Sequence, residues 1–154
     1  MPGREHIDGQ RLVGLLRQWG HELGFSQIGV ADIDLTTAEA GLQAWLDAGF
    51  HGDMSYMARH GRDYHKVLRQ RLQRLADRLQ AEVGPCGHRV FTDSAPVLEA
   101  ELAVRSGQGW RGKHTLVLDR DGGSTFFLGE IFVDLALPPT DPTTAHCGQC
   151  EACI

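Results

Sequence analysis

Three cysteines with regular spacing lie at the C-terminal end of the sequence: Cys147, Cys150 and Cys153. Two successive C-x2-C steps wrap three thiolates around one point, which is how bacterial-type ferredoxin loops hold a [4Fe–4S] cluster. A fourth ligand is required, and the sequence ends one residue after Cys153. The spacing therefore predicts the start of an iron–sulfur domain whose ligand set is incomplete, so that this chain alone would hold no stable cluster.

Zinc is the competing interpretation of the same cysteines. His146 or Cys86 would complete a set of four ligands, although His146 directly precedes Cys147 and is an awkward tetrahedral partner. No other role is assigned to Cys86. A disulfide framework would spread its cysteines along the chain to join distant segments, so their clustering favours metal ligation in a reducing compartment.

Composition limits the class of protein. A length of 154 residues allows one domain, or one domain and the start of another, and 42% hydrophobic residues are typical of a soluble protein with a core. No apolar run is long enough to cross a membrane, and no signal-peptide core is present, so we expect a cytoplasmic protein without a membrane partner. The net charge of −5 requires that any contact with RNA use a local basic patch.

Apolar residues at helical spacing dominate the first half of the chain. Asp8 as N-cap and Gly24 as stop delimit the first predicted helix, and a Thr36–Glu39 capping box opens a second that ends at Gly49. The two further predicted helices run from near Arg62 to about Val83, and onward from a cap at Ser94 and Pro96.

Short strand patterns dominate the second half. A strand contains Val90 and Phe91, and two more, over 115–118 and about 124–133, flank a turn at 121–123. A glycine-rich loop at 107–114 precedes them, and prolines mark a linker at 138–145. The predicted fold class is α+β.

Several short blocks occur in an order that resembles one known family, the epoxyqueuosine reductases. They lie at residues 54–61 (Met-Ser-Tyr-Met-Ala-Arg-His-Gly), 61–66 (Gly-Arg-Asp-Tyr-His-Lys), 91–96 (Phe-Thr-Asp-Ser-Ala-Pro), 109–114 (Gly-Trp-Arg-Gly-Lys-His), 127–130 (Phe-Leu-Gly-Glu) and 146–153 (His-Cys-Gly-Gln-Cys-Glu-Ala-Cys). Each block is weak alone, whereas the ordered set is specific and covers nearly the whole chain.

The resemblance implies a domain organisation. Residues 1–137 are expected to form a mixed helix and sheet, nitroreductase-like, cobalamin-binding catalytic domain, followed by the linker 138–145 and the first residues, 146–154, of a ferredoxin-like 4Fe-4S domain. Two departures stand out. A segment with a core strand that the family carries is absent after Gly61, and so is the family's C-terminal part.

The function implied by the resemblance is reduction of epoxyqueuosine to queuosine in tRNA, the last step of queuosine biosynthesis. A cobalamin, reduced by iron–sulfur clusters, would act on the epoxide. Because the departing oxygen needs a proton, an acid must lie beside the cobalt, and Asp63 matches the family's proton donor. A carboxylate near a helix start is also favoured by the helix dipole, which is the structural explanation of Asp63.

The resemblance also implies residues that contact cobalamin. They are Arg59, Tyr64, His65, Asp93, Ser94, Trp110, Gly112, Lys113 and His114. Glycines in the 107–114 loop would let the backbone approach a flat macrocycle, and a helix start at Ser94 would offer free N–H groups. The alternative interpretation gives these residues structural roles only, as helix caps, turn glycines and a solvated arginine.

The expected partners are tRNA, through its anticodon stem-loop, and a small redox electron donor, with the chain acting as a monomer. Lys66, Arg69 and Arg74 are the candidate tRNA contacts, on a helix that holds six of the fifteen Lys and Arg residues. A solvated basic face is the alternative. Two other functions stay open: a related corrinoid enzyme such as a reductive dehalogenase, and a non-catalytic or zinc-binding fragment.

Overall fold

A computed structural model describes residues 8–34, 44, 64–93 and 97–152. Its helices and strands are α1 (Gly9–Glu22), α3 (Tyr64–Val83), β1 (His88–Phe91), α4 (Glu99–Arg105), β2 (Trp110–Arg111), β3 (Val117–Leu118) and β4 (Glu130–Val133). The mixture of helices with small antiparallel sheets confirms the α+β class. The helix predicted over 36–49 lies outside the described residues except for Ala44, which is helical.

Helix α1 begins and ends where the sequence predicts. The Asp8 carboxylate accepts hydrogen bonds from the backbone N–H groups of Gln10 and Arg11, at 3.1 and 3.2 Å. After the C-cap at Leu23, Gly24 takes a φ of +89°, a conformation that residues with a side chain rarely adopt. Local capping chemistry therefore sets both ends of this helix.

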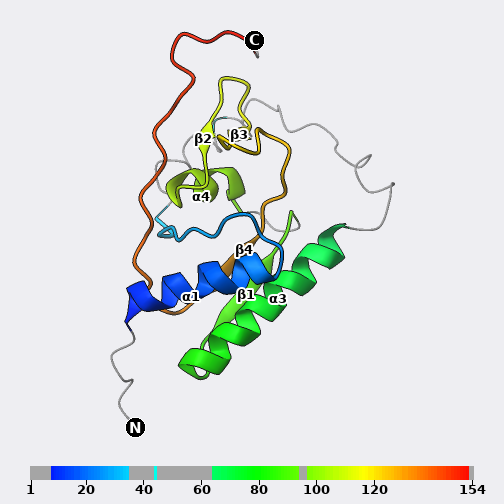
Figure 1. Cartoon of the computed structure of the whole chain (residues 1–154), viewed down its shortest axis with the longest axis vertical. Coiled ribbons are helices and arrows are strands. Elements are labelled where there is room, and N and C mark those ends of the chain that lie inside the picture. The colour runs from blue at the N-terminus through cyan, green and yellow to red at the C-terminus, as the bar shows by residue number, and fades with distance from the viewer. Residues whose placement is uncertain (1–7, 35–43, 45–63, 94–96, 153–154) are drawn as a thin grey trace.

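The core forms where α1 packs on α3, and Figure 1 shows these two helices side by side. The buried residues of the core cluster are Leu12, Leu16, Leu23, Leu75 and Leu79. Two ion pairs flank it, Arg11 with Glu82 at 2.8 Å and Arg78 with Glu22 at 2.5 Å. Because these charges are largely solvent-exposed, the leucines rather than the ion pairs hold the helices together.

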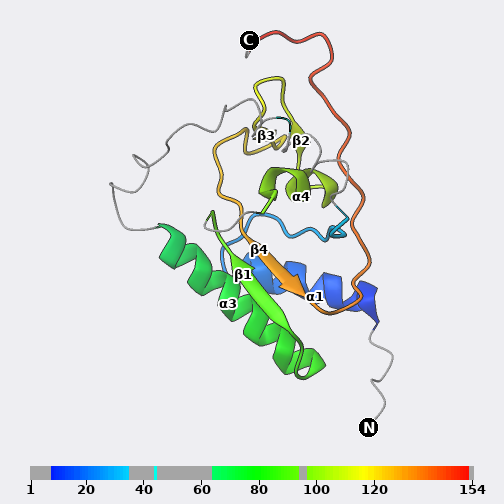
Figure 2. The ribbon, with the colours of Figure 1, turned by 180° about the vertical axis from the view of Figure 1, so that it is seen from behind.

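A two-stranded antiparallel sheet covers the helix pair, as Figure 2 shows. Strands β1 and β4 pair in a register that sets Val90 opposite Ile131 and Phe91 opposite Glu130. Ile131 and Val133 pack against the leucine cluster. Strand β4 is therefore placed by apolar contact with α1 and α3 as well as by its hydrogen bonds to β1.

The strand expected over 124–133 is shorter than predicted and begins only at Glu130. The turn at 121–123 forms, closed by a bridge between Asp119 and Gly123, but the strands on its two sides pair elsewhere. Strand β3 pairs with β2, inside the predicted glycine-rich loop, while β4 reaches β1. The apolar side chains of β4 are buried on the helices, and this outweighs local pairing across the turn.

Helix α4 also begins later than the Ser94–Pro96 signal predicted. Its N-cap is Leu98, which makes no side-chain capping bond, and its first residue is Glu99. Ser94 and Pro96 lie outside the described residues. The Glu99 carboxylate reaches back to accept a 2.9 Å hydrogen bond from the N–H of Asp93, so the first residue of the helix is tied to the segment that follows β1.

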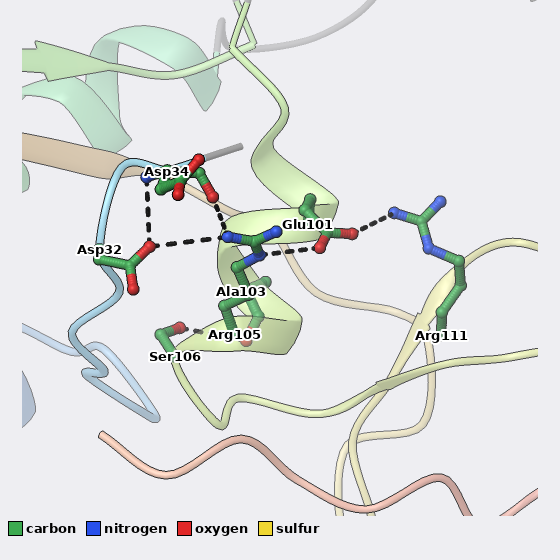
Figure 3. A network of polar contacts seen from close by, with 7 residues as sticks. All are labelled: Asp32, Asp34, Glu101, Ala103, Arg105, Ser106 and Arg111. Carbon is green, nitrogen blue, oxygen red and sulfur yellow. Dashed lines mark hydrogen bonds and ion pairs between the residues drawn. The ribbon is translucent and has the colours of Figure 1, made fainter. Parts of the chain in front are cut away.

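Arg105 joins three parts of the chain, as Figure 3 shows. Its guanidinium donates to Glu101 at 2.9 Å and to the backbone oxygen of Asp34, and it lies 3.6 Å from the Asp32 carboxylate. Glu101 in turn lies 3.8 Å from Arg111 in β2. The segment before residue 35, helix α4 and strand β2 are thereby linked through one half-buried arginine.

The predicted linker lies along the body of the molecule. Thr140 donates its N–H to the Val30 oxygen at 2.8 Å, and the Thr143 hydroxyl donates to the Gly107 oxygen at 2.9 Å. Residues 138–145 are therefore tied to the α+β domain. None of the described helices is long and apolar enough to cross a membrane.

Strand β4 carries a carboxyl group into this arrangement. The Oε2 atom of Glu130 is buried and has no hydrogen-bond partner among the residues that the structure describes. Burial, together with the negative charges of Glu99 and Asp93, raises the pKa of the Glu130 carboxyl to about 8. The folded protein therefore favours the neutral form of this glutamic acid at neutral pH.

We predict that the raised pKa of Glu130 makes stability fall with pH. The unfolded chain releases this proton near about 4.3, whereas the folded chain holds it up to about 8. The contribution of this group to stability is therefore fully present below the pKa of the unfolded chain. It is lost as the pH rises through the pKa of the folded chain. Because the carboxyl is partly exposed and solvent screens its interactions, the full shift is not converted into free energy. Between about pH 5 and pH 8.5 the wild type should lose on the order of 1–3 kcal/mol more unfolding free energy than Glu130→Gln. Urea unfolding at both pH values measures this, and parallel losses in the two proteins would contradict it.

Candidate functional site

A polar cluster forms where α3 begins, β1 ends and α4 begins. The hydroxyl of Tyr64, the first residue of α3, donates a hydrogen bond to the Asp93 carboxylate. The N–H of Asp93 donates to Glu99 Oε1 at 2.9 Å. Asp93 is two residues beyond β1 and has a φ of +48°, in the left-handed region. The contacts thus join Tyr64 and Asp93, both predicted from the sequence, to Glu99, which was not.

Three carboxyl groups interact at this place. Burial, with the hydrogen bond to the Asp93 carboxyl and the charge of Asp93, raises the pKa of Glu99 to about 7. The charge of His65 opposes it. Glu130 interacts with both Asp93 and Glu99. Like charges held close together cannot all ionise easily, so this cluster retains protons near neutral pH, as a site for acid catalysis must.

Aromatic rings lie beside the carboxyl cluster. The Tyr64 ring stacks on His65, with centroids 4.1 Å apart, and on Phe127, with centroids 4.3 Å apart. Phe127 is 65% exposed, which is unusual for a large apolar side chain. The structure therefore places a solvent-accessible aromatic surface next to groups that hold protons, and such surfaces bind flat ligands by stacking.

A second cluster joins the glycine-rich loop to the cysteine segment. The Trp110 indole N–H donates to Cys147 Sγ at 3.4 Å, and the Lys113 ammonium donates to the Cys150 backbone oxygen at 2.8 Å. The Trp110 ring also meets His146 edge to face, with centroids 4.9 Å apart. Predicted cofactor residues and predicted metal ligands, separated by 37 positions in the sequence, are therefore in direct contact.

The glycines of this loop have a structural explanation. A Cβ atom at Gly109 would lie 2.2 Å from the Leu118 backbone oxygen, and one at Gly112 would lie 2.6 Å from the His114 ring. His114 accepts a hydrogen bond from the Leu116 N–H at 3.3 Å. The Leu118 backbone therefore requires glycine at position 109, whatever ligand the loop contacts, whereas the atoms close to Gly112 belong to side chains.

The remaining predicted residues divide into two groups. Lys66, Arg69 and Arg74 are exposed on α3. Asp63, Arg59, Ser94 and Cys153 lie outside the described residues. Within the described ranges, no three His, Cys, Asp or Glu side chains are grouped to hold a metal ion.

Sequence reasoning missed Glu99, Glu130 and Phe127 as members of the site. One signal was present: Glu130 is the single charged residue in the otherwise apolar run 126–133. A carboxyl in a half-buried strand needs a partner or a proton.

Comparison with known proteins identifies relatives of one kind. The sequence model described as epoxyqueuosine reductase QueG, DUF1730, matches residues 38–94. The epoxyqueuosine reductase of Alicycliphilus denitrificans is 52% identical to this chain, and the alignment covers 94% of this chain and 55% of the relative's length. The epoxyqueuosine reductase of Pseudomonas aeruginosa is 45% identical, and the alignment covers 96% of this chain and 54% of that relative's length.

Solved structures show the same fold. Epoxyqueuosine reductase from Streptococcus thermophilus is 22% identical, with a TM-score of 0.78, over 88% of this chain and 49% of the other. An epoxyqueuosine reductase in complex with an epoxyqueuosine-modified tRNA-Tyr stem loop is 18% identical, with a TM-score of 0.78, over 93% of this chain and 50% of the other.

The alignments also show a difference in length inside the matched region. The match to the Alicycliphilus protein extends over 198 positions, which exceeds the 154 residues of this chain by 44. At least that many positions of the relative therefore have no counterpart here. The chain belongs to the epoxyqueuosine reductase family, and it spans about half the length of the curated relatives that it matches.

Proposed function

We propose that this chain is the cobalamin-binding portion of an enzyme that reduces epoxyqueuosine to queuosine in tRNA. Family membership over 94% of the chain is the observation that carries the proposal. One structural neighbour was solved with an epoxyqueuosine-modified tRNA stem loop, which supports tRNA as the substrate. All the relatives compared are epoxyqueuosine reductases, which favours this reaction over reductive dehalogenation.

The residues present fit a cobalamin in their chemistry. A corrin ring is flat and carries amide groups at its rim, so it needs apolar or aromatic surface and hydrogen-bonding partners. Exposed Phe127 stacked on Tyr64 offers the first, and Asp93, Trp110, Lys113 and His114 offer the second. Arg59, His65, Ser94 and Gly112 complete the proposed contact set. When bound, cobalamin supplies electrons to the epoxide carbon.

Residues of this chain would hold and donate the protons that the reaction consumes. Converting an epoxide to an alkene and water consumes two electrons and two protons, so the departing oxygen must be protonated. We assign the first proton to Asp63. Its neighbour Tyr64 is hydrogen-bonded to Asp93, and Glu99 has a pKa raised to about 7 by burial and by its hydrogen bond to Asp93. The cluster therefore holds protons beside the proposed donor at neutral pH.

Electrons would enter through the cysteine segment. Cys147, Cys150 and Cys153 are proposed ligands of a 4Fe-4S cluster that a small redox protein reduces. Trp110 donates its N–H to Cys147 Sγ, an interaction that stabilises negative charge on sulfur.

The tRNA would approach along α3. Lys66, Arg69 and Arg74 are exposed, and their positive charges suit the phosphates of an anticodon stem. Metal analysis separates this enzyme from a zinc-binding fragment. Cobalt in this chain, and iron once the downstream cysteine region of a relative is added, support the enzyme; zinc alone supports the fragment, and no metal supports an inert remnant.

We predict that Asp63→Asn separates catalysis from cofactor binding. In this chain, titration with cobalamin should change the corrin absorption spectrum equally for wild type and variant. In the full-length Alicycliphilus relative, the matching substitution should lower turnover by about 100-fold or more, because the departing oxygen loses its proton donor. Loss of the spectral change in the variant would show instead that Asp63 is structural.

We predict that the hydrogen bond from Trp110 raises the reduction potential of the proposed cluster. In a protein extended by the downstream cysteine region of a relative, a reducible cluster should form, and Trp110→Phe should shift its potential to more negative values because a hydrogen bond to sulfur is lost. Electrochemical titration measures the potential, and Trp19→Phe, which changes a tryptophan that packs against the helix core, is the matched control. Absence of iron from the extended protein would overturn the ferredoxin assignment.

A further inference from the structure

The proposed reaction consumes two protons, and Asp63 accounts for one of them. The second proton must reach the same oxygen as it leaves as water, so a second acidic group must supply it. Two glutamic acids of the carboxyl cluster hold protons near neutral pH. In the described part of the chain, Glu130 has a buried oxygen without a hydrogen-bond partner, whereas the Glu99 carboxyl is hydrogen-bonded to a neighbour. Glu99 is therefore the member of the cluster from which a proton has a way out.

Glu99, Asp93 and Tyr64 form a continuous hydrogen-bonded series, which we call the proton path. The Glu99 carboxyl hydrogen-bonds the Asp93 carboxyl, and the Tyr64 hydroxyl donates to Oδ2 of the same Asp93. The N–H of Asp93 donates in return to Glu99 Oε1 at 2.9 Å, which holds the two carboxyl groups together. A carboxylate that is hydrogen-bonded to an acid on each side can take a proton from one and pass it to the other.

The backbone at Asp93 is held in a conformation that residues with a side chain rarely adopt. Its φ of +48° lies in the left-handed region, and such strain persists only where the surrounding contacts maintain it. Helix capping does not explain it, because the N-cap of α4 is Leu98 and makes no side-chain capping bond. The contacts that do maintain it are those to Tyr64 and Glu99, so the backbone here serves to place the Asp93 carboxyl between them.

The two ends of the proton path lie in different surroundings. Glu99 is half-buried, which disfavours its charged form and keeps its proton in place. At the other end, the Tyr64 ring stacks on Phe127, which is 65% exposed, and Tyr64 directly follows Asp63 in the sequence. The path therefore leads from a half-buried acid to the accessible aromatic surface where the ligand is proposed to bind.

We propose that Glu99 stores the second proton of each turnover and delivers it through Asp93 and Tyr64 to the departing oxygen, an inference that rests on the proposed function. The Tyr64 O–H bond breaks as that oxygen takes the proton and leaves as water, and the electrons come from the reduced cofactor. Asp93 returns a proton to the Tyr64 oxygen and receives one from Glu99, which regains its own from solvent. Tyr64 is thus a catalytic residue, and Glu99, which acts through it, is a positioning residue.

Infrared titration of the carboxyl groups of this chain tests proton storage without cofactor or substrate. The groups that act on Glu99 are Asp93 after β1 and His65 on α3, and Glu130 on β4 titrates separately with a pKa of about 8. Wild type should show a protonated-carboxyl band that disappears as the pH rises through the Glu99 pKa of about 7. Glu99→Gln should lack this band, because glutamine keeps the acceptor for the Asp93 N–H but has no acidic proton.

Tyr64→Phe tests the other end of the path in the same titration. The Tyr64 hydroxyl stabilises the charged form of Asp93, so its loss should move the midpoint of the coupled carboxyl pair to higher pH. An unchanged band in Glu99→Gln, or a midpoint that Tyr64→Phe leaves in place, would show that the three side chains do not share a proton.

Kinetics of the full-length Alicycliphilus relative test proton delivery. Since delivery requires neutral Glu99, the rate should fall as the pH rises through its pKa. The substitution matching Glu99→Gln should lower kcat by about tenfold or more, leave KM unchanged and remove this fall between about pH 6 and pH 8. Tyr64→Phe should act alike, and the two losses should not add, because both break one path. The matched control is Glu101→Gln, on the same helix but paired with Arg105 and Arg111 outside the cluster, and it should keep the wild-type pH profile (Figure 3).

The outcomes separate this inference from the proposed function. A wild-type pH profile in the Glu99 variant, or additive losses in the double variant, would overturn the proton path while leaving the proposed reaction in place. Failure of this chain to bind cobalamin would instead overturn the proposed function and, with it, the delivery step that rests on it.

Discussion

The contact between the leucines of α1 and α3 and the apolar side chains of β4 is the interaction on which the rest of the structure depends. Leu16, Leu75 and Leu79 provide a buried surface, and Ile131 and Val133 pack onto it. Because alternate residues of a strand face opposite ways, burying these two side chains fixes the orientation of the whole strand. The hydrogen-bonded register with β1 then sets Glu130 opposite Phe91.

That placement has an electrostatic consequence at the site. Glu130 comes close enough to Asp93 and Glu99 for the three carboxyl groups to affect one another, and burial raises the pKa values of both glutamates. None of these residues is adjacent in the sequence. A helix start, a strand end and a second strand supply one carboxyl each, so proton retention near neutral pH is a property of the packing rather than of any single motif. Residues of the same strand also line an apolar cavity.

The glycine-rich loop shows how one segment serves two purposes. Gly109 is required by the close approach of the Leu118 backbone, while Trp110 and Lys113, from the same hairpin, contact the cysteine segment. A rigid hairpin holds these two side chains in place better than an irregular loop does.

The sequence by itself determined what depends on local chemistry. Asp8 and Gly24 marked the ends of α1, the leucine period marked α3 up to Val83, and the ordered motifs indicated the family. Only the tertiary structure decided what depends on contacts between distant residues. It moved the start of α4 to Glu99, paired β4 with β1 instead of across the 121–123 turn, and joined Tyr64, Asp93 and Glu99. The physical reason is that periodicity and capping act within a few residues, whereas strand pairing and carboxyl pKa values follow from burial against partners far along the chain.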